Sequence, residues 1–275
     1  MPTVKLYFDD NYIPLFKNML YSAMLYKEQA TNFDLVIGVE NKRQNPDDSE
    51  TSIGGLTQNG QDAVLKFCRL IGVSVTFEEI LSSEEVFTSE DFQRNFSTMH
   101  HIPYFSLIAR LIMFTNATED FVYLDVDLIM QPGWDSIFSI EPQNSSTAIM
   151  AANDSNRSSL ELFRSNAEHP QNWVMLETSN QDHYFNSGVM KFSYRAWKEF
   201  KISDKLISIL NKIERGEVTA EYADQDVINH ITQNNFESLD ETFNVLVSPW
   251  GGSSINNHYS LDKKIIQKFC TTSAE

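Results

Sequence analysis

Residues 121–130 read Phe-Val-Tyr-Leu-Asp-Val-Asp-Leu-Ile-Met, and this stretch decides the fold. Its first four residues form a short apolar run, which is typical of a buried strand. Asp125 and Asp127 follow, and residues two apart on an extended backbone point the same way, so both carboxylates can face one point. Two buried carboxylates need a counter-ion, and a hard divalent cation with oxygen ligands would supply it. The alternative interpretation is a solvated turn at the end of a strand.

The composition limits the classes of protein that fit. The chain has 275 residues, of which 41% are hydrophobic, enough for one large domain or two small ones. A formal net charge of −17 disfavours nucleic acid and anionic membranes as partners. Cys68 and Cys270 lack the spacing of metal-binding or redox pairs. Because we find no export signal and no membrane-length apolar run, we expect a cytoplasmic protein without a membrane span.

The order of the apolar patterns predicts an α/β fold. The chain opens with a strand, a helix and a second strand, and a β-α-β opening favours a parallel sheet with right-handed crossovers. The predicted strands are residues 4–8, 33–39, 73–78, 121–124, 148–152 and 243–247, with a tight turn at 185–188 that leads into a strand ending at 192. The predicted helices are residues 12–26, 56–72, 104–114, 159–166, 194–213 and 223–233.

Polar residues follow three of the predicted strands. These groups are Asp9-Asp10-Asn11, the Asp125/Asp127 pair, and Asn153-Asp154. The carboxyl ends of parallel strands meet at one edge of an open α/β sheet, where ligands bind. We therefore expect these groups to lie near one another.

Two of the polar features have both a structural and a functional interpretation. Asp9, Asp10 and Asn11 form either an Asx turn that caps the next helix or a site that bonds the edge of a nucleotide base. Arg110 is either a residue of a helix face or a partner for a carboxylate or a phosphate. Its apolar neighbours make a plain surface role less suitable.

The second half of the chain adds further candidates. Asn186 lies in the predicted turn with Gly188, and its amide could instead bond a polyol. Asp224-Gln225-Asp226 suits a helix N-terminus, and equally suits recognition of hydroxyl groups and stabilisation of charge. His258 and Lys264 are ordinary residues in isolation. No Gly-rich phosphate loop and no Gly-x-Ser-x-Gly elbow is present, which removes several classes of enzyme.

Taken in order, these features resemble glycosyltransferase family 8 over residues 4–264, nearly the whole chain. One such motif is weak evidence, but five in the order of the family are specific. They are Phe8-Asp9-Asp10-Asn11-Tyr12, Ala109-Arg110-Leu111, Tyr123-Leu124-Asp125-Val126-Asp127 (the Asp-x-Asp motif), Asn186-Ser187-Gly188-Val189 and Ala223-Asp224-Gln225-Asp226.

The resemblance implies a GT-A type fold with a Rossmann-like, mostly parallel sheet flanked by helices. It implies a UDP-sugar donor, Mn²⁺ with Mg²⁺ as the alternative, and retention of anomeric configuration. The metal ligands carried over are Asp125, Asp127 and His258, and the catalytic residues are Gln225, Asp224 and Asp154. The donor-binding residues carried over are Asp9, Asp10, Asn11, Tyr12, Arg110, Asp125, Val126, Asp127, Asn186, Ser187 and Lys264.

The chain departs from the family near its C-terminus. The family pattern is His-x-x-Gly-x-x-Lys-Pro-Trp, and here Leu261 replaces the glycine and Ile265-Ile266 replace Pro-Trp. His258 and Lys264 keep their spacing. Since a glycine lets the backbone approach a diphosphate, Leu261 puts closure of this tail over the diphosphate in question.

These observations give one main hypothesis and two rivals. The main one is a single catalytic domain over residues 1–275, with a nucleotide half (1–130), a sugar and acceptor half (131–264) and a short tail (265–275). It moves glucose or galactose to a glycan or glycoprotein, with a second copy or other glycosyltransferases as candidate partners. One rival is a catalytically weak UDP-sugar-binding subunit of a glycosylation complex. The other, a nucleotidyltransferase, lacks its Gly-rich basic loop.

Overall fold

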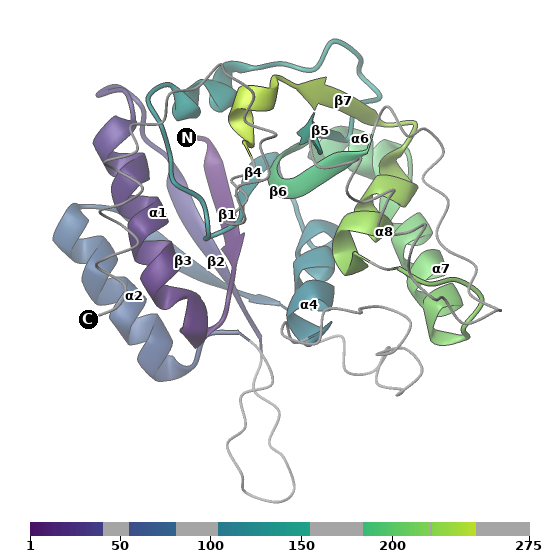
Figure 1. The fold of residues 1–275 in the computed structure, drawn as a ribbon, viewed down its shortest axis with the longest axis horizontal. Coiled ribbons are helices and arrows are strands. Elements are labelled where there is room, and N and C mark those ends of the chain that lie inside the picture. The colour runs from purple at the N-terminus through teal and green to yellow at the C-terminus, as the bar shows by residue number, and fades with distance from the viewer. Residues whose placement is uncertain (41–54, 81–103, 155–183, 221, 246–275) are drawn as a thin grey trace, which may run out of the picture. The chain divides into compact units, whose positions relative to one another are not determined.

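The computed structural model describes residues 1–40, 55–80, 104–154, 184–220 and 222–245 (Figure 1). Apart from Val245, these residues belong to one compact unit, and the fold described here is the fold of that unit. The helix predicted at 159–166 lies outside the described residues, as do His258 and Lys264.

A single seven-stranded sheet forms the centre of this unit, in the order β3-β2-β1-β4-β6-β5-β7. β6 runs antiparallel to both of its neighbours, β4 and β5, whereas the other neighbouring pairs are parallel. The predicted α/β class with a mostly parallel sheet is therefore confirmed. The strands are β1 (Thr3–Tyr7), β2 (Asp34–Glu40), β3 (Val75–Ile80), β4 (Phe121–Leu124), β5 (Ile149–Asn153), β6 (Phe185–Phe192) and β7 (Phe236–Leu239).

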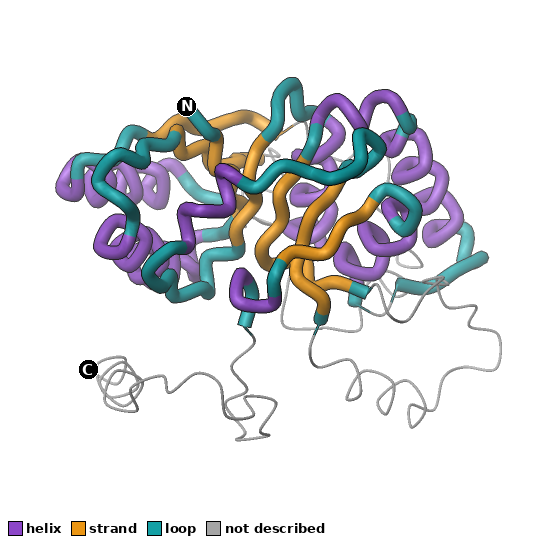
Figure 2. The backbone as a smooth tube through the Cα atoms, turned by 90° about the horizontal axis from the view of Figure 1, so that it is seen from above, coloured by secondary structure: helices purple, strands orange, loops and turns teal. Residues whose placement is uncertain are grey.

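Helices cover both faces of the sheet (Figure 2). One face packs against α1 and α2, and the other against α4, α6, α7 and α8. The helices are α1 (Ile13–Tyr26), α2 (Gln58–Ile71), α4 (Tyr104–Thr115), α6 (Tyr194–Glu199), α7 (Ile202–Glu214) and α8 (Ala223–Thr232). Short 3-10 helices occupy Asp10–Tyr12, Trp134–Ser139 and Glu241–Phe243.

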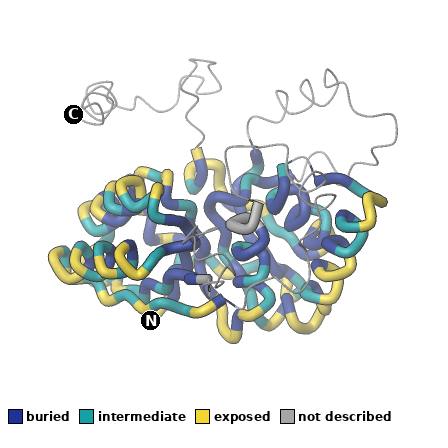
Figure 3. The backbone as a smooth tube through the Cα atoms, turned by 90° about the horizontal axis from the view of Figure 1, so that it is seen from below, coloured by how far each residue is buried: buried dark blue, intermediate teal, exposed yellow. Residues whose placement is uncertain are grey.

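The two faces of β4 enter two different hydrophobic clusters. Val122 and Leu124 join the cluster beneath α1 and α2, whereas Phe121 and Tyr123 join the cluster beneath α4 and α8. This alternation follows from the two-residue repeat of a strand. Because helices cover both faces, all four residues are buried, and buried residues follow the strands and the inner sides of the helices (Figure 3).

Phe114 of α4 is the centre of an aromatic cluster that supports β4. Its ring centroid lies 5.4 Å from that of Phe121, 5.7 Å from Tyr123 and Phe192, and 5.9 Å from Trp197. Such pairs add to the stabilisation that comes from burial alone. The cluster therefore fixes the strand that carries the Asp125/Asp127 pair.

The prediction of a turn at residues 185–188 was wrong, because β6 is a strand from Phe185 onward. A glycine is needed at 188 because β4 and β6 approach each other closely there, and not because the backbone turns. Its carbonyl accepts a hydrogen bond from the Asp125 backbone N (2.7 Å). A Cβ atom on Gly188 would lie 3.0 Å from Asn186 Oδ1 and 3.1 Å from Asp125 Oδ2. The glycine therefore lets β4 and β6 bring their polar ends together.

The single helix predicted over 194–213 is two helices. The break occurs at Lys201, which has a left-handed backbone with φ of 51°. The bend lets both Trp197 and Ile202 be buried, and the Trp197 Nε1 donates to Ser203 Oγ (2.9 Å) across it. No glycine or proline marks the break, so nothing in residues 194–213 predicts it.

The last strand was predicted in the wrong place. Residues 236–239 form β7, which pairs with β5, and the predicted strand at 243–247 begins instead in the 3-10 helix Glu241–Phe243. Residues 246 and 247 lie outside the described part. Phe236 stacks on Phe185, with ring centroids 4.6 Å apart. Pairing with β5 and this stacking favour the earlier segment.

Candidate active site

The predicted polar groups converge at one edge of the sheet. Asp125 follows β4 and Asp154 follows β5, at the carboxyl ends of parallel strands. Asn186 and Ser187 lie at the start of β6, which reaches the same edge because it runs the other way. Several of these side chains are joined directly or through Arg110 and Gln225 by hydrogen bonds.

Arg110 of α4 is the centre of this group. Its Nη1 donates to Asp125 Oδ1 (2.7 Å) and to the Tyr123 hydroxyl (3.2 Å), and its Nη2 donates to Ser187 Oγ (2.9 Å). Nη2 also forms an ion pair with Asp224 Oδ2. The side chain is 12% exposed. One buried guanidinium therefore joins residues from α4, β4, β6 and α8.

Burial and neighbouring charges have opposite effects on the pKa values of Arg110 and Asp224. Burial lowers the pKa of Arg110, but Asp224 and other neighbours outweigh it, so the pKa stays well above its ordinary value. Burial raises the pKa of Asp224 to about 6, although Arg110 acts to lower it. Burial also raises the pKa of Tyr123, whose hydroxyl donates to Asp125 Oδ1 (2.7 Å). Desolvation therefore outweighs the ion pair at Asp224.

Gln225 has a fully bonded side chain. Its Oε1 accepts from the Ser187 backbone N (3.1 Å) and lies 3.4 Å from the Ser187 hydroxyl oxygen. Its Nε2 donates to Asp154 Oδ2 (3.2 Å) and to the Tyr184 hydroxyl (3.0 Å). The Tyr184 hydroxyl in turn donates to Asp226 Oδ1 (2.8 Å). The three predicted catalytic residues thus belong to one network, with Asp224 joined through Arg110 and Ser187.

Asp125 and Asp127 offer oxygen atoms that suit a hard divalent cation. Asp125 Oδ1 is occupied by Arg110 and Tyr123, while Oδ2 accepts no hydrogen bond from any described residue. Partial loss of water raises the pKa of Asp127, and the Asp125 charge raises it further. This donor set fits Mn²⁺ or Mg²⁺, although the described part of the chain brings no third acidic, histidine or cysteine ligand to the pair.

Asn186 has only one end of its amide available. Its Oδ1 accepts from the Gly188 backbone N (2.9 Å) and from Asn244 Nδ2 (2.7 Å). A backbone N–H can only donate, so this contact assigns the oxygen and leaves Nδ2 as a donor. Asn244, Tyr123 and Tyr184 were not predicted as site residues from the sequence. Asn244 and Tyr184 each lie next to an apolar residue and carry no spacing signal, whereas Tyr123 stands two residues before Asp125, and the two-residue repeat of a strand could have placed it on the same side.

Asp9 and Asp10, which follow β1, accept hydrogen bonds that hold the local fold. Asp9 Oδ1 accepts from the Asn11 backbone N (2.8 Å), as in the Asx-turn interpretation. Asp10 accepts from Thr57 N (3.0 Å) and Thr57 Oγ1 (2.6 Å), which fastens the start of α2. A Cβ on Gly60 would lie 2.0 Å from Asp10 Oδ1. Both oxygens of Asp10 are therefore engaged within the protein.

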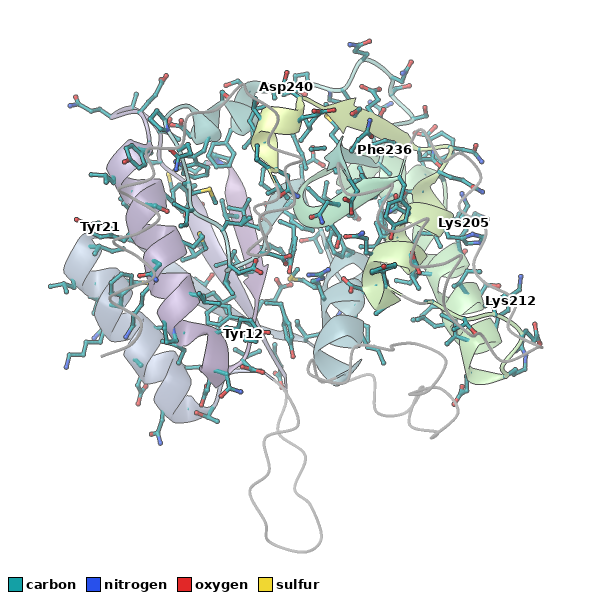
Figure 4. All side chains as sticks on the ribbon, viewed as in Figure 1. Tyr12, Tyr21, Lys205, Lys212, Phe236 and Asp240 are labelled. Carbon is teal, nitrogen blue, oxygen red and sulfur yellow. The ribbon has the colours of Figure 1, made fainter. Side chains whose placement is uncertain are left out.

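Tyr12 and Val126 lie close to the Asp125/Asp127 pair. Burial raises the pKa of Tyr12, and the charges of Asp9, Asp127 and Asp125 raise it further. The charges of both groups therefore act on Tyr12, which lies at the carboxyl end of β1 (Figure 4). Val126 is buried, so its side chain belongs to the core and only its backbone can serve a ligand. The remaining predicted residues, His258 and Lys264, are outside the described part.

Comparison with known proteins now gives the family. The family model described as glycosyl transferase family 8 matches residues 3–269. The chain belongs to glycosyl transferase family 8. Membership of this family establishes glycosyl transfer as the general activity. No curated protein sequence is significantly similar to the chain.

Solved structures of other glycosyltransferases share the fold of this family 8 chain. The galactosyltransferase LgtC, in complex with donor and acceptor sugar analogs, is 17% identical with a TM-score of 0.59, and the match covers 87% of this chain and 73% of LgtC. Mouse xyloside xylosyltransferase 1 is 14% identical with a TM-score of 0.58, covering 90% and 88%. GlyE of Streptococcus pneumoniae TIGR4 is 16% identical with a TM-score of 0.52, covering 88% and 46%. The GT-A type fold is therefore confirmed. Among the described helices, none is long and apolar enough to cross a bilayer.

Proposed function

We propose that the chain is a retaining glycosyltransferase that moves glucose or galactose from a UDP-sugar to a glycan or glycoprotein acceptor. The observation that carries this proposal is the cluster at the sheet edge. In it, Arg110 joins Asp125 to Asp224, and Ser187 links Arg110 to Gln225. Family membership supplies the class of reaction, and the cluster gathers charged and hydrogen-bonding groups at one edge of the sheet.

The three parts of a UDP-sugar have matching groups along this edge. Asp9 and Asn11 follow β1 and suit the edge of the uracil base. Asp125 and Asp127 follow the neighbouring strand β4 and suit the diphosphate through a cation. Asp154, next in order across β6, bonds Gln225 (3.2 Å) and suits the sugar hydroxyls. The order of the strands thus parallels the order of base, diphosphate and sugar.

Asp125 and Asp127, with His258 as a third ligand, would hold Mn²⁺ or Mg²⁺. A cation held there supplies positive charge for the leaving diphosphate. Arg110 brings a fixed positive charge beside Asp125, and its burial strengthens the interaction with an anionic group. Lys264 would add a second basic residue. The charge of −17 on the whole chain makes these local cations important for an anionic donor.

The Gln225 network favours attack by the acceptor on the same face of the sugar as the leaving group. A retaining enzyme that works by double displacement needs a nucleophile free to attack. Gln225 is a neutral amide whose Oε1 accepts from the Ser187 N–H. We therefore assign Gln225 to stabilising developing charge, with Asp224 and Asp154 holding the sugar.

A donor screen tests the proposal. UDP release is followed for a panel of UDP-sugars with Mn²⁺, with Mg²⁺ and with EDTA, and UDP-glucose or UDP-galactose should turn over only with metal. Asp127→Asn should lose this turnover and keep its unfolding midpoint, since the side chain is exposed. Asp204→Asn, an exposed aspartate of α7, is the control and should keep both. Turnover in EDTA, or activity that persists in Asp127→Asn, would contradict the proposed metal site.

The second candidate is a UDP-sugar-binding subunit without efficient turnover. The observation in its favour is Leu261, which stands where the family has glycine. Calorimetric titration of UDP in the presence of Mn²⁺ separates the two candidates. Binding of UDP without release of UDP from any sugar nucleotide would favour the binding subunit, and turnover would exclude it.

A further inference from the structure

The Gln225 side chain is held by a chain of hydrogen bonds that leads away from the sheet edge into the core. Its second member, Tyr184, immediately precedes β6 and is 5% exposed. Its third member, Asp226, lies one residue beyond Gln225 and is 1% exposed. A buried chain of this kind, one end of which lies in the proposed donor site, can act on catalysis without touching the substrate.

With Asp226 as a carboxylate, which can only accept, the hydrogen bonds that join Gln225, Tyr184 and Asp226 have one direction. Asp226 Oδ2 accepts from the Tyr222 backbone N (2.9 Å), as a carboxylate does. The Tyr184 hydroxyl therefore donates its one hydrogen to Asp226 Oδ1 (2.8 Å) and must accept at its oxygen. The group that approaches that oxygen at 3.0 Å is Gln225 Nε2. A flipped amide would place a second acceptor there, and the bond would be lost.

The other end of the amide leads to the same assignment independently. Gln225 Oε1 faces the Ser187 backbone N at 3.1 Å, and a backbone N–H can only donate. A flipped amide would set Nε2 against this N–H, so that two donors face each other. The two ends therefore agree on one orientation, which directs Nε2 toward Asp154 Oδ2 (3.2 Å).

We propose that Tyr184 is a positioning residue, whose hydroxyl holds the Gln225 carboxamide in one of its two orientations. Asp226 acts through Tyr184, because it removes the hydroxyl hydrogen that would otherwise oppose Nε2. The consequence for turnover rests on the proposed function, in which Gln225 stabilises charge beside the donor sugar. The effect of Tyr184 on the orientation of the Gln225 amide does not depend on the proposed function.

The first experiment measures how strongly Tyr184 restrains the Gln225 amide, without any need for activity. Protein labelled with ¹⁵N-glutamine is compared as wild type, Tyr184→Phe and Thr232→Val, with Gln225→Ala used to assign the Nε2 signals. Thr232 is the matched control, because its buried hydroxyl lies on α8, the helix of Gln225, and donates to Ile228 O (2.7 Å). Exchange of the Gln225 Nε2 protons should be about tenfold faster in Tyr184→Phe, the factor that corresponds to one lost hydrogen bond. It should be unchanged in Thr232→Val. Unchanged exchange in Tyr184→Phe would overturn the proposal.

A second variant keeps the test decisive should Tyr184→Phe fold poorly. In Asp226→Asn the one side-chain oxygen that remains still accepts from the Tyr222 backbone N–H, so the new amide NH₂ faces the Tyr184 hydroxyl. Two donors, this new amide and Gln225 Nε2, then approach the Tyr184 oxygen, and its hydroxyl hydrogen no longer has a carboxylate to accept it. Exchange at Gln225 Nε2 should therefore rise in Asp226→Asn as well, and a wild-type rate in this variant would contradict the relay.

The turnover experiment is a double-mutant cycle with Gln225→Ala. Tyr184→Phe should lower kcat about tenfold and leave the UDP affinity within about twofold, but should have no effect on kcat in the Gln225→Ala background. A merely structural role for Tyr184 would lower kcat in both backgrounds, and that result would overturn the proposal. If the wild type turns over no UDP-sugar, the proposed function fails, and the exchange measurement still decides the role of Tyr184.

Discussion

Asp224 gives the sharpest test of the electrostatics at the site. It is a buried carboxyl, 3% exposed, and its pKa is raised from 3.8 to about 6 because burial outweighs its ion pair with Arg110. Above the unfolded pKa, the folded chain must either keep a proton that the unfolded chain has lost or ionise the buried acid. The stability contribution is therefore complete below about pH 4, falls as the pH rises to about 6, and is constant above that.

The size of the effect follows from the shift of about two pKa units. Each unit corresponds to about 1.4 kcal/mol, so wild type should lose about 3 kcal/mol through Asp224 between pH 4 and pH 7. Asp224→Asn is neutral at every pH and has nearly the same shape. It should match wild type near pH 4 and exceed its free energy of unfolding by about 3 kcal/mol at pH 7. A residue of the proposed donor site would thus lower the stability of the fold.

The assay is urea unfolding of both proteins in EDTA at several pH values from about 4 to 7.5. Asp240→Asn is a control of opposite sign. Asp240 accepts from Thr242 Oγ1 (2.6 Å) and N (2.9 Å), which lower its pKa. Its contribution is therefore lost only as the pH falls below the unfolded pKa, and its difference from wild type should stay level across this range. An Asp224→Asn difference that also stays level would refute the reasoning.

Three further predictions concern how the fold supports the site. Gly60→Ala should destabilise the protein by about 1–3 kcal/mol in urea unfolding, because a Cβ would lie 2.0 Å from Asp10 Oδ1; an equal loss in an Asp10→Ala background would show that this contact is not the cause. Lys201→Gly should raise the free energy of unfolding by about 1 kcal/mol, because Lys201 is exposed and has φ of 51°; a loss of stability would contradict strain at this break. Phe114→Ala should lower the free energy of unfolding by about 3–5 kcal/mol, because the ring is fully buried among four aromatic side chains; a loss below about 1 kcal/mol would mean that the cluster repacks.

The sequence was sufficient for the elements with a strong and simple period. The run 121–124 and the strand that opens the chain were found within one residue, because strands covered on both faces are nearly continuous apolar runs. Helix 104–114 was found because its polar residues are few and well spaced. The break at Lys201 could not be found, since its cause is the burial of Trp197 and Ile202, which only the folded chain defines.

The same distinction holds at the site. Asp125, Asp224 and Gln225 could be identified because their motifs lie in short, ordered stretches of sequence. Tyr184 could not, because its role depends on a contact with a helix that begins some 40 residues later. Long-range hydrogen bonds leave no periodic signal in either segment.

The place of β6 in the sheet has a consequence for how the chain is made. β6 lies between β4 and β5, yet it follows both of them in the sequence. Roughly 60 residues separate the end of β4 from the start of β6, which a ribosome adds in about 3–12 s. During that time the outer edge of β4, the strand that leads to Asp125, has no neighbour to bond its backbone. Unpaired strand edges invite association with other chains, so the nascent chain passes through an interval in which the strand of its proposed metal site is an open edge.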